Sequence, residues 1–374
     1  MFRLRNRSFA LAVALVFPTI PCIGMNEHLI YIGTYTRTDS KGIYALRLND
    51  TTGELSTPEL VATTANPSFI ALSKDRSHLY AVSEGATFAV PFAVNLATGK
   101  LVPDESRDSG GKAPCYLMVD ATEQCLVVAH YHNGIVASLP INKDGSLGPV
   151  KSLHQHTGSS VVPERQESAH VHSANISPNN RHVIVCDLGL DKIFTYELDA
   201  ATATLTPAAT PFVATVPGAG PRHSAFSTDG RFVFVINELN NTLVSYAYDA
   251  DTGRLTEKDT QPTLPADFTG NSSTAEVRVH PNGKFVYGSN RGHDSIVVFA
   301  VDSGTGKLTP IDHTPSGGRN PRNFNLTPDG KWLIAANQNS NSINVFAVDD
   351  STGKLTATDH HASVSLPVCV VVAK

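Results

Sequence analysis

Cysteine is scarce in this sequence: five occur among 374 residues, and their spacing fits no zinc-binding pattern. One lies in the N-terminal segment, which leaves Cys115, Cys125, Cys186 and Cys369. Cys115 and Cys125 flank a predicted hairpin turn, but antiparallel pairing would place Cys115 opposite a residue near His130. We therefore expect no disulfide between these two, and interpret both as small buried apolar side chains.

Charge is also limited. Only 17% of the residues are charged, the formal net charge is −5, and no basic run occurs beyond the first few residues. This balance argues against nucleic acid as a partner. No segment after the N-terminus keeps a helical period of apolar residues over more than about three turns. With 27 glycines and 23 prolines, the composition instead suits many short strands and turns.

The N-terminal apolar run is too short to span a bilayer. Three arginines precede apolar residues 9–17, and a candidate cleavage site with small residues follows near Gly24. This pattern predicts a cleaved signal peptide at residues 1–24 and a periplasmic or secreted domain at residues 25–374, with no membrane association after cleavage. The alternative is that Met25 is the true start and that the protein is cytoplasmic.

Internal repetition dominates the rest of the chain. A turn followed by a leucine recurs seven times, as in "YDADTGRLT", "VDSGTGKLT" and "VDDSTGKLT". The leucines are Leu55, Leu101, Leu147, Leu205, Leu255, Leu308 and Leu355. Their successive spacings of 46, 46, 58, 50, 53 and 47 residues are typical of repeat architectures with one long interval.

A second element alternates with the first. Short apolar strands surround turns such as "STDG", "HPNG" and "TPDG", which are strong hairpin signals. Each repeat is therefore predicted to form four strands, a to d, the unit of a propeller blade. The chain begins with a strand of type b in "HLIYIGTYT" and ends with a strand of type a in "PVCVVVAK". We predict an all-β, seven-bladed β-propeller closed by pairing of the C-terminal strand with the N-terminal blade.

One mouth of this ring should collect polar side chains. Strands a and b are antiparallel, so the start of a and the end of b lie on the same face of the disc. The residues at these positions are Tyr35, Glu84, His130, His132, His170, His172, Asp187, Arg222, His223, Glu238, Glu276, Arg291, Arg322 and Gln338. The opposite face carries ordinary turn residues. Acid–base groups beside fixed cations suit hydrolysis or proton transfer on an anionic substrate.

Four motifs at these positions resemble a known family. The stretches "SAHVHSANISPNNRHVIVCDLGLDKI", "GPRHSAFSTDGRFVFVINEL", "AEVRVHPNGKFVYGSNRGHDSI" and "PRNFNLTPDGKWLIAANQNSNSI" are similar to the seven-bladed propeller lactonases. That family includes propeller-type 6-phosphogluconolactonases and carboxy-cis,cis-muconate lactonizing enzymes. The resemblance covers essentially the whole chain after Gly24. The resemblance is weak in the first two blades. The apparent signal peptide is a second departure, because an exported protein would not meet the phosphorylated lactone of the pentose phosphate pathway, which is cytoplasmic.

The resemblance implies a catalytic group of one histidine, one glutamate and two arginines. Matched by motif, these are His172, Arg222, Glu238 and Arg291, with His170 as a competing histidine. Alternating residues of a strand face the same side, so the sequence does not separate the two histidines. We assign substrate-binding roles to His170, His223, Glu276, Arg322 and Gln338.

The chemistry can be stated from the residue types. Hydrolysis of a lactone requires an attacking water, a base and a cation that stabilises the developing oxyanion. His172 or Glu238 can accept the proton, and Arg222 and Arg291 can hold an anionic group and the oxyanion. In reverse, the same residues add a carboxylate across a double bond, which is lactonization. We expect a monomeric lactone hydrolase that acts on a small, anionic, 6-phosphogluconolactone-like substrate without a cofactor.

Three alternatives remain at this point. The enzymatic alternative is a carboxy-muconate-type lactonizing cycloisomerase, because the same four residues serve both directions of the reaction. The His-x-His stretches "HYHNG" and "SAHVHS" could bind metal, but nothing fixes a three-ligand geometry. We therefore predict no metal. An exported, non-enzymatic binding propeller is the alternative from another class, although it would need no such set of charged residues. The long interval contains "HQHTGSSVVPERQES", which we interpret as a loop in the position of a lid over the mouth.

Overall fold

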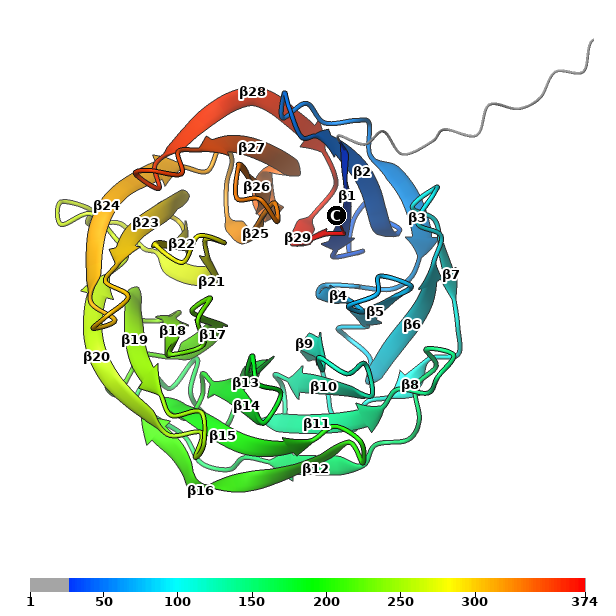
Figure 1. The fold of residues 1–374 in the computed structure, drawn as a ribbon, viewed down its shortest axis with the longest axis vertical. Helices are drawn as coiled ribbons and strands as arrows, with labels where there is room; N and C mark the ends of the chain where they lie inside the picture. Colours follow the sequence, from blue (N-terminus) through cyan, green and yellow to red (C-terminus); the bar gives the residue numbers. More distant parts are fainter. Residues whose placement is uncertain (1–26, 374) are drawn as a thin grey trace, which may run out of the picture.

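Seven β-sheets form a ring around a central axis, as Figure 1 shows. The structure is a computed structural model and describes residues 27–373. The predicted signal peptide lies outside the described residues. Within them, no helix is both long and apolar enough to cross a bilayer.

Each sheet is one blade, and its strands run in sequence order from the axis outward except at the closure. Blade 2 contains β4 (Ile70–Leu72), β5 (His78–Val82), β6 (Phe88–Val94) and β7 (Leu101–Pro103), and β8 (Arg107–Asp108) also pairs with β6. Blade 3 contains β9 (Pro114–Val119), β10 (Cys125–His130), β11 (Ile135–Pro140) and β12 (Ser152–Gln155). Blade 4 contains β13 (Val171–Ile176), β14 (His182–Asp187), β15 (Lys192–Asp199) and β16 (Thr204–Ala214).

The remaining blades repeat this order. Blade 5 contains β17 (Pro221–Phe226), β18 (Phe232–Asn237), β19 (Thr242–Tyr248) and β20 (Leu255–Pro262). Blade 6 contains β21 (Ser273–Val279), β22 (Phe285–Arg291), β23 (Ser295–Val301) and β24 (Leu308–Pro315). Blade 7 contains β25 (Pro321–Leu326), β26 (Trp332–Asn337), β27 (Ser342–Val348) and β28 (Leu355–Ser363), with the 3-10 turn η1 (Gln338–Ser340) after β26.

The two ends of the chain share blade 1, which confirms the predicted closure. Its strands lie in the order β29 (Pro367–Val372), β1 (Glu27–Thr34), β2 (Gly42–Asn49) and β3 (Glu59–Thr63). β29 pairs antiparallel with β1, with Ile30 opposite Val372 and Ile32 opposite Val370. The last strand therefore covers an edge that the first three strands would otherwise expose.

The leucine turns hold neighbouring blades together. In the turn of blade 6, Asp302 accepts hydrogen bonds from the backbone N–H groups of Gly304 and Thr305, and Gly306 has a φ of 77°. Leu308 follows and is buried. A Cβ on Gly306 would lie 2.5 Å from the ring of Phe232 in blade 5. Glycine is required there both by the left-handed backbone and by this close approach.

The innermost strands share an irregularity that shapes the centre of the ring. In β13, β17 and β25 the register against the second strand skips one residue, which is His172, Arg222 and Arg322 respectively. A bulge of this kind turns the extra side chain away from the regular alternation. The same step occurs at Cys115 in β9 and at Val368 in β29. These five side chains line one small cavity at the axis.

Candidate active site

A polar pocket of about 350 Å³ opens at the mouth where inner strands begin. It is lined by Tyr35, Arg37, Glu84, Cys115, Tyr131, His132, Arg165, His172, Glu238, Ser273, Arg291, Arg322 and Gln338. A much smaller cavity lies against it and shares the side chains of Tyr35, Glu84, Cys115, His172 and Arg322. The pocket is of a size that suits a small, strongly polar molecule.

Glu238 is the electrostatic centre of the pocket. It follows β18 directly, and its side chain is 4% exposed. Its Oε2 lies 2.8 Å from Nε of Arg222 and 2.9 Å from a terminal nitrogen of Arg291. Its Oε1 accepts a hydrogen bond of 2.5 Å from Arg165. Three guanidinium groups from three different parts of the ring therefore meet on one buried carboxylate.

These cations decide the charge of Glu238. Burial alone raises the pKa of a carboxyl group, but Arg291 and Arg222, followed by His172 and Arg165, hold the pKa of Glu238 well below its usual range. Burial also lowers the pKa of Arg222, although a guanidinium stays protonated at neutral pH. At neutral pH the group is therefore an ionised carboxylate within a cluster of arginines.

The two family-matched arginines are fixed by backbone oxygens as well. Arg222 donates 2.6 Å to the carbonyl of Ala275, and Arg291 donates 2.6 Å to the carbonyl of Thr274. Both carbonyls belong to β21, which lies between β17 and β25 around the axis. Their orientation is thus set by the framework and does not depend on Glu238 alone.

His172 faces the same pocket from β13. Its ring lies edge-on to Tyr131, with centroids 5.6 Å apart, and at 5.2 Å from the ring of His223. Its Nδ1 is buried and has no hydrogen-bond partner among the described residues. Burial, then the charges of Arg222 and His223, lowers the pKa of His172 well below its ordinary value. The imidazole is therefore neutral at pH 7 and able to accept a proton.

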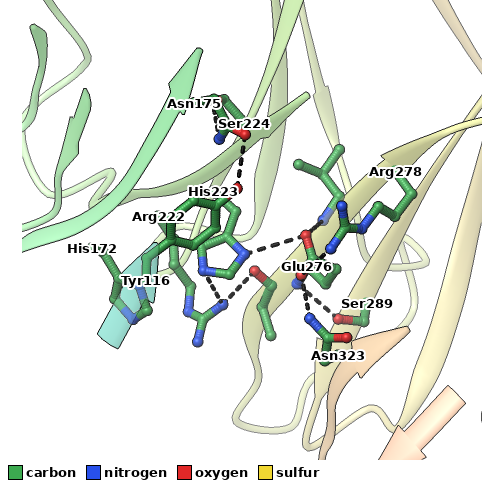
Figure 2. A network of polar contacts seen from close by, with 12 residues as sticks. Tyr116, His172, Asn175, Arg222, His223, Ser224, Glu276, Arg278, Ser289 and Asn323 are labelled. Atoms are coloured by element: carbon green, nitrogen blue, oxygen red, sulfur yellow. Dashed lines mark hydrogen bonds and ion pairs between the residues drawn. The ribbon is translucent and has the colours of Figure 1, made fainter. Parts of the chain in front are cut away.

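A polar network supports the site from below (Figure 2). Arg222 contacts Nε2 of His223 at 3.2 Å, and Nδ1 of the same ring lies 3.2 Å from Oε1 of Glu276. Arginine can only donate, so Nε2 is the acceptor and Nδ1 carries the proton. Glu276 also contacts Arg278 at 3.4 Å and accepts a hydrogen bond from Asn323. Burial raises the pKa of Glu276, but Arg278 and His223 outweigh it and lower the value to about 2.

Tyr35 organises the opposite side of the pocket. Its hydroxyl donates to both oxygens of Glu84, at 3.1 and 2.9 Å. The guanidinium carbon of Arg37 lies 4.1 Å from the ring centroid, and that of Arg322 lies 5.5 Å from it. Within residues 27–373, neither arginine forms an ion pair with an acidic residue. Two cations therefore face the pocket without a carboxylate partner of their own.

The structure separates the two histidines that the sequence left equivalent. His172 is the extra residue of the bulge and lines the pocket, whereas His170 precedes β13 and does not line it. His170 contacts the carbonyl of Tyr131 at 2.8 Å and Glu167 at 3.1 Å. The expectation that both side chains face the same side assumed a regular strand, which the bulge interrupts.

The other predicted residues fall into three groups. Arg291, Arg322 and Gln338 line the pocket, while His223 and Glu276 lie beneath it in the network of Figure 2. His130 and Asp187 are fully buried in local contacts. His130 bonds Ser109, and Asp187 bonds His156. We therefore ascribe to these last two a structural role.

Two charged pocket residues were not foreseen. Arg37 follows the first strand in "YTRTDS", and Arg165 lies in "PERQES", within the long interval. Neither occupies a repeat position, so no comparison among the blades could identify it. The only signal was the composition of the long interval and its place before His172.

The pocket histidines do not form a metal-ligand cluster. Among residues 27–373, three ligand atoms of the required types approach one another only at His28, Asp50 and Asp329. That group is remote from the pocket lining, and Lys331 contacts both of its carboxylates, at 3.4 and 2.8 Å. A cation already present in this cluster argues against a second one.

Comparison with known proteins identifies the family. The family model "Lactonase, 7-bladed beta-propeller" matches residues 29–372. The chain belongs to this family. This confirms the resemblance carried by the four motifs.

Alignments with named members of this family cover most of the chain. A protein of Bacillus subtilis named 6-phosphogluconolactonase is 36% identical over 302 residues, which cover 80% of this chain and 85% of the relative. A protein of Formosa agariphila with the same name is 30% identical over 311 residues, covering 79% and 86%. The solved structure of a periplasmic gluconolactonase from Pseudomonas aeruginosa has a TM-score of 0.88 at 33% identity and covers 92% of this chain and 99% of its own.

Proposed function

We propose that this protein hydrolyses the cyclic ester of a sugar acid, a 6-phosphogluconolactone-like lactone, without a metal. The observation that supports this most directly is that Arg291, Glu238 and a neutral His172 line one pocket, while Arg222, which lines the small adjoining cavity, contacts the same carboxylate. The names of the relatives from Bacillus subtilis and Formosa agariphila support the substrate class.

His172 is the base in this proposal. Arginines contact both oxygens of Glu238, whereas Nδ1 of the neutral His172 has no hydrogen-bond partner among the described residues and is free to take a proton, even though burial lowers the pKa of this imidazole as well. The ring removes a proton from water as the water oxygen attacks the lactone carbonyl. The negative charge of Glu238 then stabilises the imidazolium that forms, because it raises the pKa of His172.

The arginines stabilise the tetrahedral intermediate. Arg291 lines the pocket, so its guanidinium can donate to the developing oxyanion. Preorganised donors at such a position are worth about 10²- to 10³-fold in rate. When the ring C–O bond breaks, the imidazolium returns its proton to the leaving oxygen, and the product is the open hydroxy acid.

The acidic group of the substrate binds on the other side of the pocket. Arg37 and Arg322 flank Tyr35 and lack carboxylate partners, while Arg222 and Arg291 are occupied by Glu238. A phosphate or carboxylate placed between these two arginines would form ion pairs and charge-assisted hydrogen bonds with both of them. Glu84, with Tyr35 donating to it, can accept hydrogen bonds from sugar hydroxyls.

The test is hydrolysis of 6-phosphogluconolactone and of unphosphorylated gluconolactone, with and without chelator, by the wild type and Glu238→Gln. We expect chelator-resistant turnover above the spontaneous rate that the substitution reduces by at least about 100-fold. Turnover that a chelator abolishes would contradict the metal-free mechanism. Failure to open either lactone would favour lactonization of a muconate-type acid, or a propeller that only binds.

We also propose that the protein is exported and monomeric. The N-terminal sequence has the composition of a signal peptide, and the similar Pseudomonas aeruginosa protein is described as periplasmic. Cell fractionation with mass determination of the mature N-terminus tests export. Light scattering at several concentrations tests the monomer.

A further inference from the structure

Arg165 contacts the catalytic centre from outside the propeller repeat. It lies between β12 and β13, in the interval of 58 residues that separates Leu147 from Leu205. Its guanidinium donates 2.5 Å to Oε1 of Glu238 and lies 3.4 Å from the hydroxyl of Tyr131. Its side chain is 39% exposed and lines the pocket.

The segment that carries Arg165 is anchored on both sides of it. The neighbouring Gln166 is fully buried, donates 2.9 Å to the carbonyl of Leu188, and accepts 3.1 Å from the N–H of Val162. Ser160 donates 2.6 Å to Asp191. Buried amide hydrogen bonds of this kind are costly to break. These contacts hold the segment against the pocket, in the position that the sequence predicted for a lid.

The contacts divide the two oxygens of Glu238. Oε2 contacts Arg222 and Arg291, which also donate hydrogen bonds to backbone carbonyls of β21. Oε1 accepts a hydrogen bond from Arg165 alone. Without Arg165, Oε1 would have no donor among the described residues, and the carboxylate could rotate away from Arg291. The long interval thus supplies the contact that sets the carboxylate's orientation.

We propose that Arg165 is a positioning residue, which holds Glu238 as an oriented anion so that Glu238 can fix Arg291 and support His172. The inference rests on the proposed lactonase function. It assigns to the long interval a role in catalysis that the repeat framework does not provide.

Other charged and titratable groups face Glu238 and set the expected pH effect. They are Arg222 on β17, Arg291 at the end of β22, His172 on β13, Arg322 on β25 and Tyr131 after β10. Loss of the Arg165 charge leaves fewer cations around the carboxylate, so its pKa must rise. Glu238 then becomes protonated at a higher pH. The acid limb of the pH profile, where kcat/KM falls as the pH decreases, therefore shifts to higher pH.

The experiment compares Arg165→Met and Arg165→Lys with the matched control Arg319→Met. Arg319 is exposed near the same mouth, and within residues 27–373 the one hydrogen bond of its side chain is to the carbonyl of Asn339, at 3.4 Å. We expect Arg165→Met to lower kcat/KM by about 10- to 100-fold, chiefly through kcat, and to move the acid limb upward. Arg165→Lys keeps the charge and should keep the acid limb near that of the wild type. The control should match the wild type in both respects.

A second measurement does not depend on turnover. The pKa of the Glu238 carboxyl is followed by ¹³C NMR of glutamate-labelled protein, with the signal assigned from Glu238→Gln. It should rise in Arg165→Met and, if that variant folds poorly, in Arg165→Gln. An unchanged carboxyl pKa and acid limb in a folded variant overturn the proposal. A wild type that opens no lactone overturns the proposed function instead, and the NMR result still decides the role of Arg165.

Discussion

Arg222 and Glu238 are 16 residues apart in sequence, yet Nε of the arginine lies 2.8 Å from Oε2 of the glutamate. The pair forms because β17 and β18 are antiparallel, with Pro221 opposite Asn237. Arg222 follows Pro221 and Glu238 follows Asn237, so both lie at the same end of the hairpin. The bulge at Arg222 then turns its side chain toward the axis. One hairpin of one blade thus supplies both the proposed catalytic cation and its counter-ion.

This arrangement predicts unequal effects of removing the two partners. Glu238→Gln leaves three arginines without a counter-ion, whereas Arg222→Met leaves Glu238 with Arg165 and Arg291. Breaking a buried ion pair costs about 3 to 5 kcal/mol when the remaining charge is unpaired. We expect Glu238→Gln to reach that range and Arg222→Met to cost less, in free energies of unfolding measured by urea denaturation.

The double variant tests whether the two residues act as a unit. If they do, Arg222→Met with Glu238→Gln is less destabilised than the sum of the two single variants, by about 0.5 to 3 kcal/mol. Additive losses would mean that the contact contributes nothing beyond the separate environments of the two side chains.

His223 makes stability depend on pH. Burial lowers its pKa to about 4, although Glu276 opposes the shift, and Arg222, Arg278 and His172 also face this ring. The unfolded chain, with a histidine pKa near 6.5, binds more protons than the folded protein between these values, so stability falls as pH falls from about 6.5 toward 4. The loss attributable to His223 between pH 7 and pH 5 is about 2 kcal/mol.

The test compares the pH slope of the unfolding free energy in His223→Gln and His361→Gln. His361 is exposed on β28, so its replacement should leave the slope of the wild type unchanged. His223→Gln should flatten the slope whatever its effect on absolute stability at pH 7. Equal slopes in all three proteins would show that His223 is protonated in the folded state at pH 5.

The fold was predictable because its determinants are local and repeated. The turn that ends in Leu308 recurs in every blade, and each copy begins with its own Asn or Asp; six copies carry a glycine, and in blade 4 Ala203 takes its place with a φ of 52°. Closure followed from the two ends, since a chain that begins with a strand of type b and ends with one of type a leaves a single place for the last strand.

The site was less predictable where it departs from the repeat. The sequence placed His172, Arg222 and Arg322 at the correct mouth, because the starts of the inner strands share one face. It could not distinguish His170 from His172, since the bulge arises from pairing between strands and has no signature in the alternation. Arg165 lies in a segment without any period, so only the folded chain brings it to Glu238.

A glycine of the leucine turns offers a test of the packing between blades. Gly306 has a φ of 77°, and an added Cβ would lie 2.5 Å from the ring of Phe232. We expect Gly306→Ala to destabilise the protein by more than about 1 kcal/mol, because strain and overpacking add. Gly304, two residues earlier, has no left-handed φ, and its added Cβ meets only Oδ1 of Asp302, at 3.2 Å. Thermal unfolding should show a clear loss for Gly306→Ala and little change for Gly304→Ala.

The proposed subsite at Arg322 and Arg37 predicts how the enzyme separates charged from neutral lactones. A phosphate between two guanidinium groups gains charge-assisted hydrogen bonds worth about 1.5 to 3 kcal/mol each, which a neutral sugar lactone does not make. Arg322→Gln should therefore lower kcat/KM for 6-phosphogluconolactone by about 10- to 100-fold and leave gluconolactone nearly unaffected. Arg37→Gln should act in the same direction but more weakly, because Arg37 is exposed to solvent that screens its charge.

Both lactones must be measured with each variant, and Arg319→Gln serves as the charge-matched control. Equal losses on the two substrates would place Arg322 in the chemistry common to both and would leave the acidic group to another part of the pocket. A wild type that prefers gluconolactone, with an unchanged kcat/KM in Arg322→Gln, would instead show that Arg322 binds no acidic group of the substrate. That outcome would fit an exported enzyme, whose surroundings lack the cytoplasmic phosphorylated lactone.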